Sequence, residues 1–171
     1  MRNTLAITVL GHDRPGIIAE VTAALASLGG NLEDSSMTLL RGHFAMTLIV
    51  SVDSDIDAVS DSLKMLSDEG LTVSVMPVQD ESSTASAGES YLLSVHGADR
   101  PGIVSAITSV VAAHGGNIVD LTTRLGSALY VLTAEVIVVQ DSVAALRAEL
   151  ESVAGSIGVD VSFLPTDADT I

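Results

Sequence analysis

The amino-acid sequence predicts an α+β fold built from two copies of one βαββαβ unit, and three observations lead to this prediction. The segment Asp13–Ile17, which reads DRPGI, returns as Asp99–Ile103, a shift of 86 positions from 13 to 99. The segment Gly29–Asn31 returns at the same shift as Gly115–Asn117. In each copy, stretches with the period of a strand and stretches with the spacing of a helix follow one another in the same order.

The first copy is expected to begin with a strand and a helix. Leu5, Ile7 and Val9 alternate with smaller or polar residues, which is the period of a strand. The helix is expected to start at Pro15. Proline has no backbone N–H, and the first N–H groups of a helix have no partner within the helix, so proline costs nothing there. Its apolar residues recur at helical spacing and are Ile17, Ile18, Val21, Leu25 and Leu28. Gly29-Gly30 should end it, since glycine adopts the left-handed conformation readily.

Two strands, a second helix and a last strand are expected next. The strands cover residues 31–41 and 43–52, with a turn near Arg41-Gly42. The almost continuous apolar run 44–52 predicts a central strand buried on both faces. Asp53-Ser54-Asp55 offers capping side chains for a helix whose apolar face is Ile56, Val59, Leu63 and Leu66. Gly70 should end this helix before a strand over 71–75.

The second copy repeats this order, and Tyr130 takes the place of Phe44. Its strands are expected near 91–97, 117–126, 128–139 and 159–165. Its helices are expected near 101–114 and 141–155, with Asp141 or Ser142 as the cap of the second. This order of elements is that of a ferredoxin-like sandwich, in which two helices cover one face of a four-stranded antiparallel sheet.

The copies define two ferredoxin-like domains, over residues 1–78 and 90–165. Residues 79–89 hold no large apolar side chain and are rich in Ser, Ala and acidic residues, which predicts a flexible linker. Residues 166–171 are predicted to form a frayed tail. The apolar runs 44–52 and 130–139 suggest that another sheet or protomer covers the second face of each domain, and we expect a homodimer.

The composition excludes several classes of function. Seven basic and 22 acidic residues give a net charge of −15, so direct binding to a nucleic acid is not expected. The absence of cysteine excludes disulfides, thiol nucleophiles and Cys-type metal sites. The sequence contains no run of about 18 apolar residues, so no membrane span is expected. The first residues lack the zones of a signal peptide, and we expect a cytoplasmic protein.

The repeated turn between the first strand and the first helix is the strongest chemical signal. Glycine and proline shape the chain at the start of the helix, where open N–H groups attract a carboxylate or another anion. Asp13, and Asp99 in the second copy, can accept a hydrogen bond from an ammonium group. A turn that offers both features suits a zwitterionic amino acid.

The glycine–asparagine motif lies at the other end of the same helix. The helix separates Asn31 from the turn by about 20 Å, at about 1.5 Å of rise per residue. One small ligand therefore reaches both only where two copies pack together, with the turn of one facing the asparagine of the other. This spacing predicts a ligand at a domain interface.

The paired DRPGI and GGN motifs in βαββαβ units resemble ACT domains, which are small regulatory modules that bind amino acids. The resemblance covers both copies. Two such units with little else are similar to the family of glycine cleavage system transcriptional repressors. The resemblance implies a non-catalytic regulatory protein that binds a glycine-like or serine-like effector and acts on a protein partner that the sequence does not identify.

The resemblance also implies which residues bind the effector, because ACT domains hold effectors with the loop before the first helix and the start of the second strand. In this sequence, the corresponding ligand-binding residues are Gly11, Asp13, Pro15, Gly16, Ile17, Asn31, Gly97, Asp99, Pro101, Gly102, Ile103 and Asn117. Serine-binding members carry asparagine where Asp13 and Asp99 stand.

Four of these residues also have a purely structural interpretation. Asp13 and Asp99 are alternatively caps of the first helix, and Asn31 and Asn117 are alternatively left-handed turn residues. Arg14 and Arg100 are expected to face solvent or a neighbouring acid.

Other kinds of site find no support in the motifs. The four histidines share no metal-ligand spacing, so no metal site is expected. No P-loop, dinucleotide fingerprint or nucleophile elbow is present, so no catalytic residue and no cofactor is assigned. Three hypotheses stay open: an amino-acid sensor, a constitutive interaction or dimerisation module that has lost ligand binding, and an unrecognised small enzyme.

Overall fold

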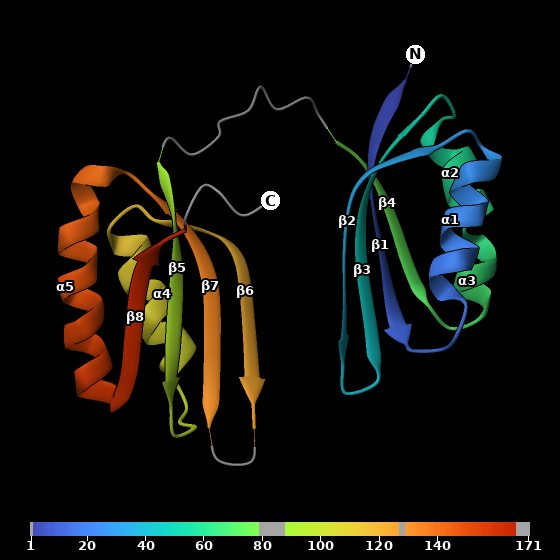
Figure 1. Ribbon diagram of the computed structural model, residues 1–171. Helices are drawn as coiled ribbons and strands as arrows, with labels where there is room; N and C mark the ends of the chain where they lie inside the picture. The colour runs from blue at the N-terminus through green and yellow to red at the C-terminus, as the bar shows by residue number, and fades with distance from the viewer. Residues whose placement is uncertain (1, 79–87, 127–128, 167–171) are drawn as a thin grey trace. The chain divides into compact units, whose positions relative to one another are not determined.

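The computed structural model describes residues 2–78, 88–126 and 129–166. The chain divides into two compact units, unit 1 (Met1–Ser82) and unit 2 (Ser83–Ile171). Each unit is a four-stranded antiparallel sheet with its helices against one face (Figure 1). The predicted α+β fold with two ferredoxin-like units is therefore confirmed. Of the predicted linker 79–89 and tail 166–171, only Gly88, Glu89 and Thr166 lie within the described residues.

Unit 1 has the strand order β2-β3-β1-β4. Its elements in chain order are β1 (Asn3–His12), α1 (Ile17–Ser27), β2 (Asn31–Leu40), β3 (His43–Val52), α2 (Ile56–Ser62), α3 (Lys64–Asp68) and β4 (Thr72–Pro77). Leu5, Ile7 and Val9 of β1 are buried in the core between sheet and helices, as their alternation predicts.

Unit 2 repeats the topology with the strand order β6-β7-β5-β8. Its elements are β5 (Glu89–Gly97), α4 (Ile103–Ala113), β6 (Asn117–Leu125), β7 (Tyr130–Val138), α5 (Gln140–Ile157) and β8 (Val159–Pro165). The edge strands of the two units share an irregularity: the register with the neighbouring strand shifts between Leu32 and Asp34, and again between Ile118 and Asp120.

Within each unit, the helices cover one face of the interior strands β3 and β7, and the predicted cover of the second face by another sheet or protomer stays a prediction. Phe44, Met46 and Leu48 are buried, whereas Thr47 between them is exposed. Alternate residues of a strand point to opposite faces, and the helices of each unit cover one of them. We call the other face, which carries His43, Ala45, Thr47 and Ile49 in β3, the open face of unit 1.

The second helical segment differs between the units. In unit 1 the predicted helix is divided at Leu63 into α2 and α3, and Asp55 caps α2 by accepting from the Ala58 N–H at 2.8 Å. In unit 2 one helix runs for 18 residues, and Val139 precedes it without a side-chain cap. The prediction of Asp141 or Ser142 as the cap is wrong, because both lie inside α5.

The first helix of each unit starts two residues later than predicted. Gly16 and Gly102 precede α1 and α4 with φ of 96° and 93°, a conformation that a helix does not contain. Pro15 therefore lies before the helix. At the other end the prediction is confirmed: Gly29 has φ of 70°, and the Gly30 N–H donates to the Leu25 carbonyl at 3.0 Å. Within the described residues, no helix is long and apolar enough to cross a membrane.

Candidate functional site

The loop between β1 and α1 is held against the β2–β3 turn. The Asp13 N–H donates to the Gly42 carbonyl at 3.0 Å. Arg41 and Gly42 form this turn with φ of 50° and 81°. Positive φ at both positions gives the backbone twist that a tight hairpin requires. The backbone of the repeated motif is thus fixed next to the first residues of β3.

A hollow of about 250 Å³ lies beside this loop in unit 1. The motif, the first turn of α1 and the two neighbouring strands supply its lining, which is Asp13, Arg14, Gly16, Ile17, Ile18, Ala19, Met37 and Phe44. Three of the predicted binding residues, Asp13, Gly16 and Ile17, are therefore brought together around one small concavity.

Unit 2 forms the equivalent hollow, of about 280 Å³. Its lining consists of Asp99, Arg100, Gly102, Ile103, Val104, Ser105 and Tyr130. Each of these residues corresponds to a lining residue of unit 1 at the repeat shift. Because both copies build the hollow from the same positions, the repeated motif itself determines it.

The start of the helix beside each hollow has no side-chain cap. Gly16 and Gly102 have no side chain to offer, and among the residues that the structure describes no other side chain caps α1 or α4. The interpretation of Asp13 and Asp99 as helix caps is therefore wrong. The first N–H groups of a helix and its dipole favour a negative group at this position.

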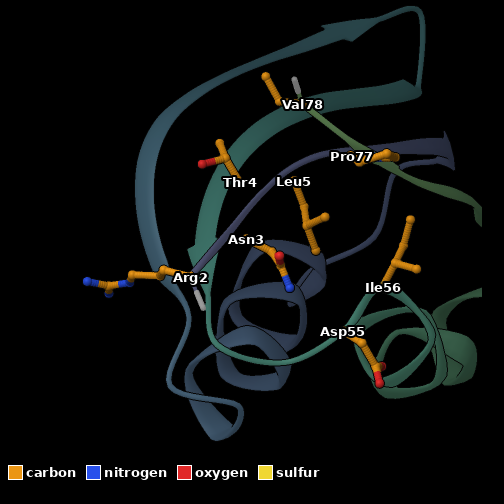
Figure 2. A pocket seen from close by; sticks show the side chains of 8 residues that line it. All are labelled: Arg2, Asn3, Thr4, Leu5, Asp55, Ile56, Pro77 and Val78. Atoms are coloured by element: carbon orange, nitrogen blue, oxygen red, sulfur yellow. The ribbon is translucent and has the colours of Figure 1, made fainter. Parts of the chain in front are cut away.

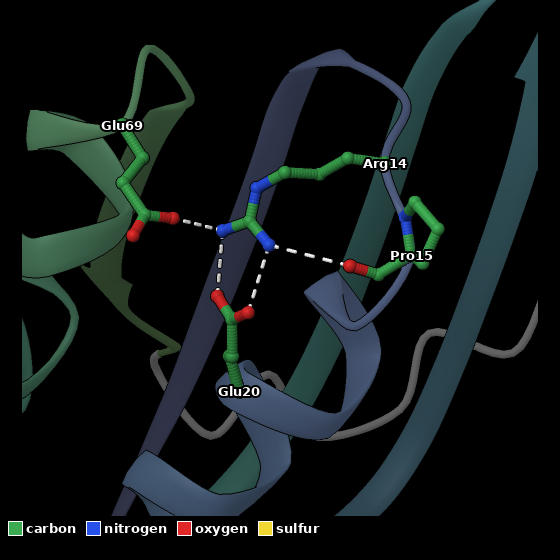
Figure 3. Close-up of polar contacts among 4 residues, drawn as sticks. All are labelled: Arg14, Pro15, Glu20 and Glu69. Atoms are coloured by element: carbon green, nitrogen blue, oxygen red, sulfur yellow. Dashed lines mark hydrogen bonds and ion pairs between the residues drawn. The ribbon is translucent and has the colours of Figure 1, made fainter.

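The guanidinium of Arg14 is held by two carboxylates (Figure 3). Its Nη1 and Nη2 donate to Glu20 at 2.7 and 2.6 Å, and Nη2 also donates to Glu69. The hydrogen bond with Glu20 is the main cause that raises the pKa of Arg14, and the same bond lowers the pKa of Glu20. The expectation that Arg14 faces a neighbouring acid is confirmed.

Arg100 in unit 2 has no such partners. Its Nη1 donates to the Ile157 carbonyl at 3.3 Å, and within the described residues it forms no ion pair. Ala106 and Ile157 stand where unit 1 has Glu20 and Glu69. Arg100 therefore keeps free donors beside the hollow, whereas those of Arg14 are used by Glu20 and Glu69.

The remaining predicted residues do not line either hollow. Gly11, Pro15, Gly97 and Pro101 shape the loops without contributing to the lining. Asn31 opens β2 opposite Ser51, at the far end of α1, and Asn117 does the same in β6. Arg41 is the one non-glycine residue with positive φ in the described part of the chain, so Asn31 and Asn117 are not left-handed turn residues.

The sequence interpretation missed several lining residues. Phe44 is 1% exposed and Tyr130 is half-buried, and both border the hollows. Their match across the repeat is the signal that identifies them. Met37 has no such signal, since it lies two strands away from the motif in sheet order and only the strand pairing brings it near.

A larger hollow of about 410 Å³ lies at the other end of β1 (Figure 2). Its lining is Arg2, Asn3, Thr4, Leu5, Asp55, Ile56, Pro77 and Val78. Tyr91 stands in unit 2 where unit 1 has Leu5, and it stacks on Phe163 with ring centroids 4.8 Å apart. The repeated motif takes no part in this hollow. The candidate sites are therefore the two smaller hollows beside the repeated loops.

Comparison with known proteins agrees with this assignment of the repeats. Residues 3–76 and 89–164 each match the ACT domain family. The glycine cleavage system transcriptional repressor of Escherichia coli strain K12 is 31% identical over 121 residues, which is 70% of this chain and 64% of the repressor. A UPF0237 protein of Methanococcus maripaludis is 36% identical over 75 residues, 42% of this chain and 83% of that protein.

A solved structure extends the likeness to almost the whole chain. The crystal structure of an unknown protein from Galdieria sulphuraria has a TM-score of 0.86 and 29% sequence identity. The match covers 97% of this chain and 99% of that protein.

Proposed function

This chain belongs to the ACT domain family, with two ACT domains over most of its length, and from this premise we propose that it is a non-catalytic regulatory protein that binds a small amino acid. The relative named as a transcriptional repressor supports a regulatory role. The effector we propose is glycine-like or serine-like, because each hollow is small and borders both a carboxylate and an open helix N-terminus.

The observation that carries the proposal is the pairing of opposite charges in the unit 2 hollow. Asp99 offers a carboxylate to the ammonium group of an amino acid. Arg100 and the first N–H groups of α4 offer donors to its carboxylate, and hydrogen bonds between charged groups are the stronger kind.

Unit 2 is proposed as the stronger site of the two. Around its hollow stand one carboxylate, Asp99, and one guanidinium, Arg100. The unit 1 hollow is lined by Asp13 and Arg14, and the Arg14 guanidinium is already bound by Glu20 and Glu69. An effector carboxylate would meet repulsion there and would have to displace Glu20 from Arg14.

Regulation is proposed to act through protein contacts in a homodimer. The chain's charge of −15 disfavours a nucleic acid as the direct partner. The exposed apolar side chains of β2, which are Leu32, Met37, Leu39 and Leu40, suit a contact with a second protomer. In such a dimer, Asn31 or Asn117 of the second protomer would complete the far side of a hollow.

A thermal-shift screen of the full chain against the standard amino acids tests the proposal. A ligand present at about 100 times its Kd stabilises a fold by about 2.7 kcal/mol. We expect a selective shift with a small amino acid that is lost in Arg100→Ala and retained in Arg14→Ala. No shift with any amino acid at millimolar concentration, in a chain whose unfolding is cooperative, would contradict the proposal.

A constitutive interaction module is the second candidate function, and the ion pairs of Arg14 favour it for unit 1. A guanidinium already bound to two carboxylates needs no effector to fix its loop. This candidate predicts that the mass of the assembly in solution is the same with and without amino acids. Light scattering across an amino-acid titration separates the two functions.

A further inference from the structure

We propose that His12 and His43 form a binding site for a divalent transition-metal ion on the open face of unit 1. His12 is the last residue of β1 and His43 is the first residue of β3, and the two are paired directly across the antiparallel ladder. Their ring centroids lie 5.0 Å apart with an interplanar angle of 60°. The residues are 31 positions apart in the chain, so no spacing motif reveals them.

The spacing of the rings fits a shared metal ion. An imidazole nitrogen binds zinc at about 2.0–2.1 Å, which places two ring centroids roughly 5 Å apart at a tetrahedral angle. Both side chains lie on the open face, because alternate residues of a strand point to opposite faces. Phe44 points into the core and is next to His43, and Val9 points into the core and is three positions before His12. Both histidines are exposed, so an ion reaches them from solvent.

The other two histidines have different surroundings. His96 lies 3.7 Å from Asp160, and His114 lies 3.4 Å from Glu149 with its Nδ1 3.0 Å from the Val110 carbonyl. Within the described residues, His12 and His43 form no such ion pair or side-chain hydrogen bond, and each faces the other ring. Their nitrogens are therefore available to a metal.

The chemistry of the pair selects the metal. Imidazole suits Zn²⁺, Cu²⁺ and Ni²⁺, whereas Mg²⁺ and Ca²⁺ prefer oxygen ligands. Among the described residues no group of three or more His, Asp or Glu is placed to hold an ion, so two imidazoles bind it and water fills the other positions. The order of stability for divalent ions places Cu²⁺ first.

Unit 2 serves as an internal control. Ala98 and Leu129 stand where unit 1 has His12 and His43, so the proposed site belongs to unit 1 alone. One ion per chain is therefore expected. The site also differs from the effector hollows, since its side chains lie on the opposite face of the sheet from Phe44.

Calorimetric titration of the full chain with Cu²⁺, Ni²⁺, Zn²⁺ and Mg²⁺ tests the proposal. We expect one transition-metal ion per chain, no comparable binding of Mg²⁺, and at least tenfold weaker binding in His12→Ala and in His43→Ala. His96→Ala is the matched control and should bind as the original chain does. Unfolding midpoints of the metal-free variants establish that each is folded.

Three results would overturn the site. Equal affinity in the original chain and both variants would mean that the acidic surface binds the ion without the histidines. Loss of binding in His96→Ala to the same extent would place the ion elsewhere. In folded protein, absence of any Cu²⁺ binding above the level of Mg²⁺ would also exclude it.

Discussion

The loops of the two ACT domains have the same five residues, and their glycines have nearly the same φ of 96° and 93°, yet their arginines have different partners. Arg14 is held by Glu20 and Glu69, whereas Arg100 donates to one backbone carbonyl. The difference comes from positions outside the repeated motif. The motif thus determines the shape of the hollow, and its unrepeated neighbours determine the charge around it.

The two arginines nevertheless share one structural role. Glu69 follows the last residue of α3, and Ile157 is the last residue of α5. In both units the arginine therefore joins the first loop to the end of the second helical segment. The units differ in the number of guanidinium N–H donors that remain available to a ligand.

Removal of the buried aromatic ring should give the largest difference between the units. Phe44→Ala should destabilise unit 1 by about 3–5 kcal/mol, because it removes a ring that is only 1% exposed and leaves a cavity in the core. Tyr130→Ala should cost unit 2 about 1–2 kcal/mol, because the ring is half-buried. Amide hydrogen exchange, followed separately in peptides of each unit, measures both. Equal losses would show that the two hollows are packed alike.

An exchange of charges between the units should reverse the order of their affinities for the effector. This prediction rests on the proposed function. Ala106→Glu gives Arg100 a carboxylate partner and should weaken binding about 10- to 100-fold, the value of a charged hydrogen bond of about 1.5–3 kcal/mol. Glu20→Ala combined with Glu69→Ala should create a second site in unit 1. Calorimetric titration with the effector measures both changes.

Ala106→Gln is the control for that exchange, since it adds the bulk of glutamate without its charge. It should bind nearly as the original chain does. If Ala106→Gln and Ala106→Glu weaken binding equally, the size of the side chain and not its charge explains the difference between the units.

The caps of the second helical segments should differ by a smaller amount. Asp55→Ala should cost unit 1 about 1 kcal/mol, because it removes the hydrogen bond to the Ala58 N–H. Asp141→Ala should change unit 2 by only a few tenths of a kcal/mol, because Asp141 lies inside α5 and caps nothing. Denaturant unfolding with exchange detection in each unit compares them, and a cost of 1 kcal/mol in unit 2 would contradict the cap assignment.

Acidification should give the smallest difference, because the ion pair of Arg14 is partly exposed. The pKa of Glu20 lies below its ordinary value of 4.5 in the folded chain. Its contribution to stability is therefore complete above that value and is lost as the pH falls below it. The unfolding midpoint of unit 1 should exceed that of Glu20→Gln at pH 6, and the gap should narrow as the pH falls below 4.5. A gap that persists in acid would contradict the ion pair.

The repeat and the periodicity were sufficient to predict the fold, because each element has a strong local pattern. The helix starts were wrong by two residues, since the sequence does not reveal that Gly16 takes a positive φ. The cap of α5 was wrong because Val139 has no capping side chain to mark the position. The division of the helix at Leu63 has no sequence signal, since Leu63 fits the apolar face of an unbroken helix.

The candidate site was less predictable from sequence than the fold. Asp13, Gly16 and Ile17 are neighbours in the chain, so the motif identified them. Met37 and the carboxylate of Glu69 reach the loop only through tertiary structure. His12 and His43 meet only through the antiparallel pairing of β1 with β3, which no spacing rule describes.

The register shift in the outer strands limits how these strands can be extended by another chain. Continuous ladder pairing in β2 runs from Asp34 to Leu40, and the extra residue before it bends and twists the strand. A partner strand that adds to this edge cannot continue past that point in register. The same irregularity in β6 limits strand addition at the edge of unit 2. Both units therefore have exposed apolar edge strands that do not offer a full-length template for fibrous aggregation.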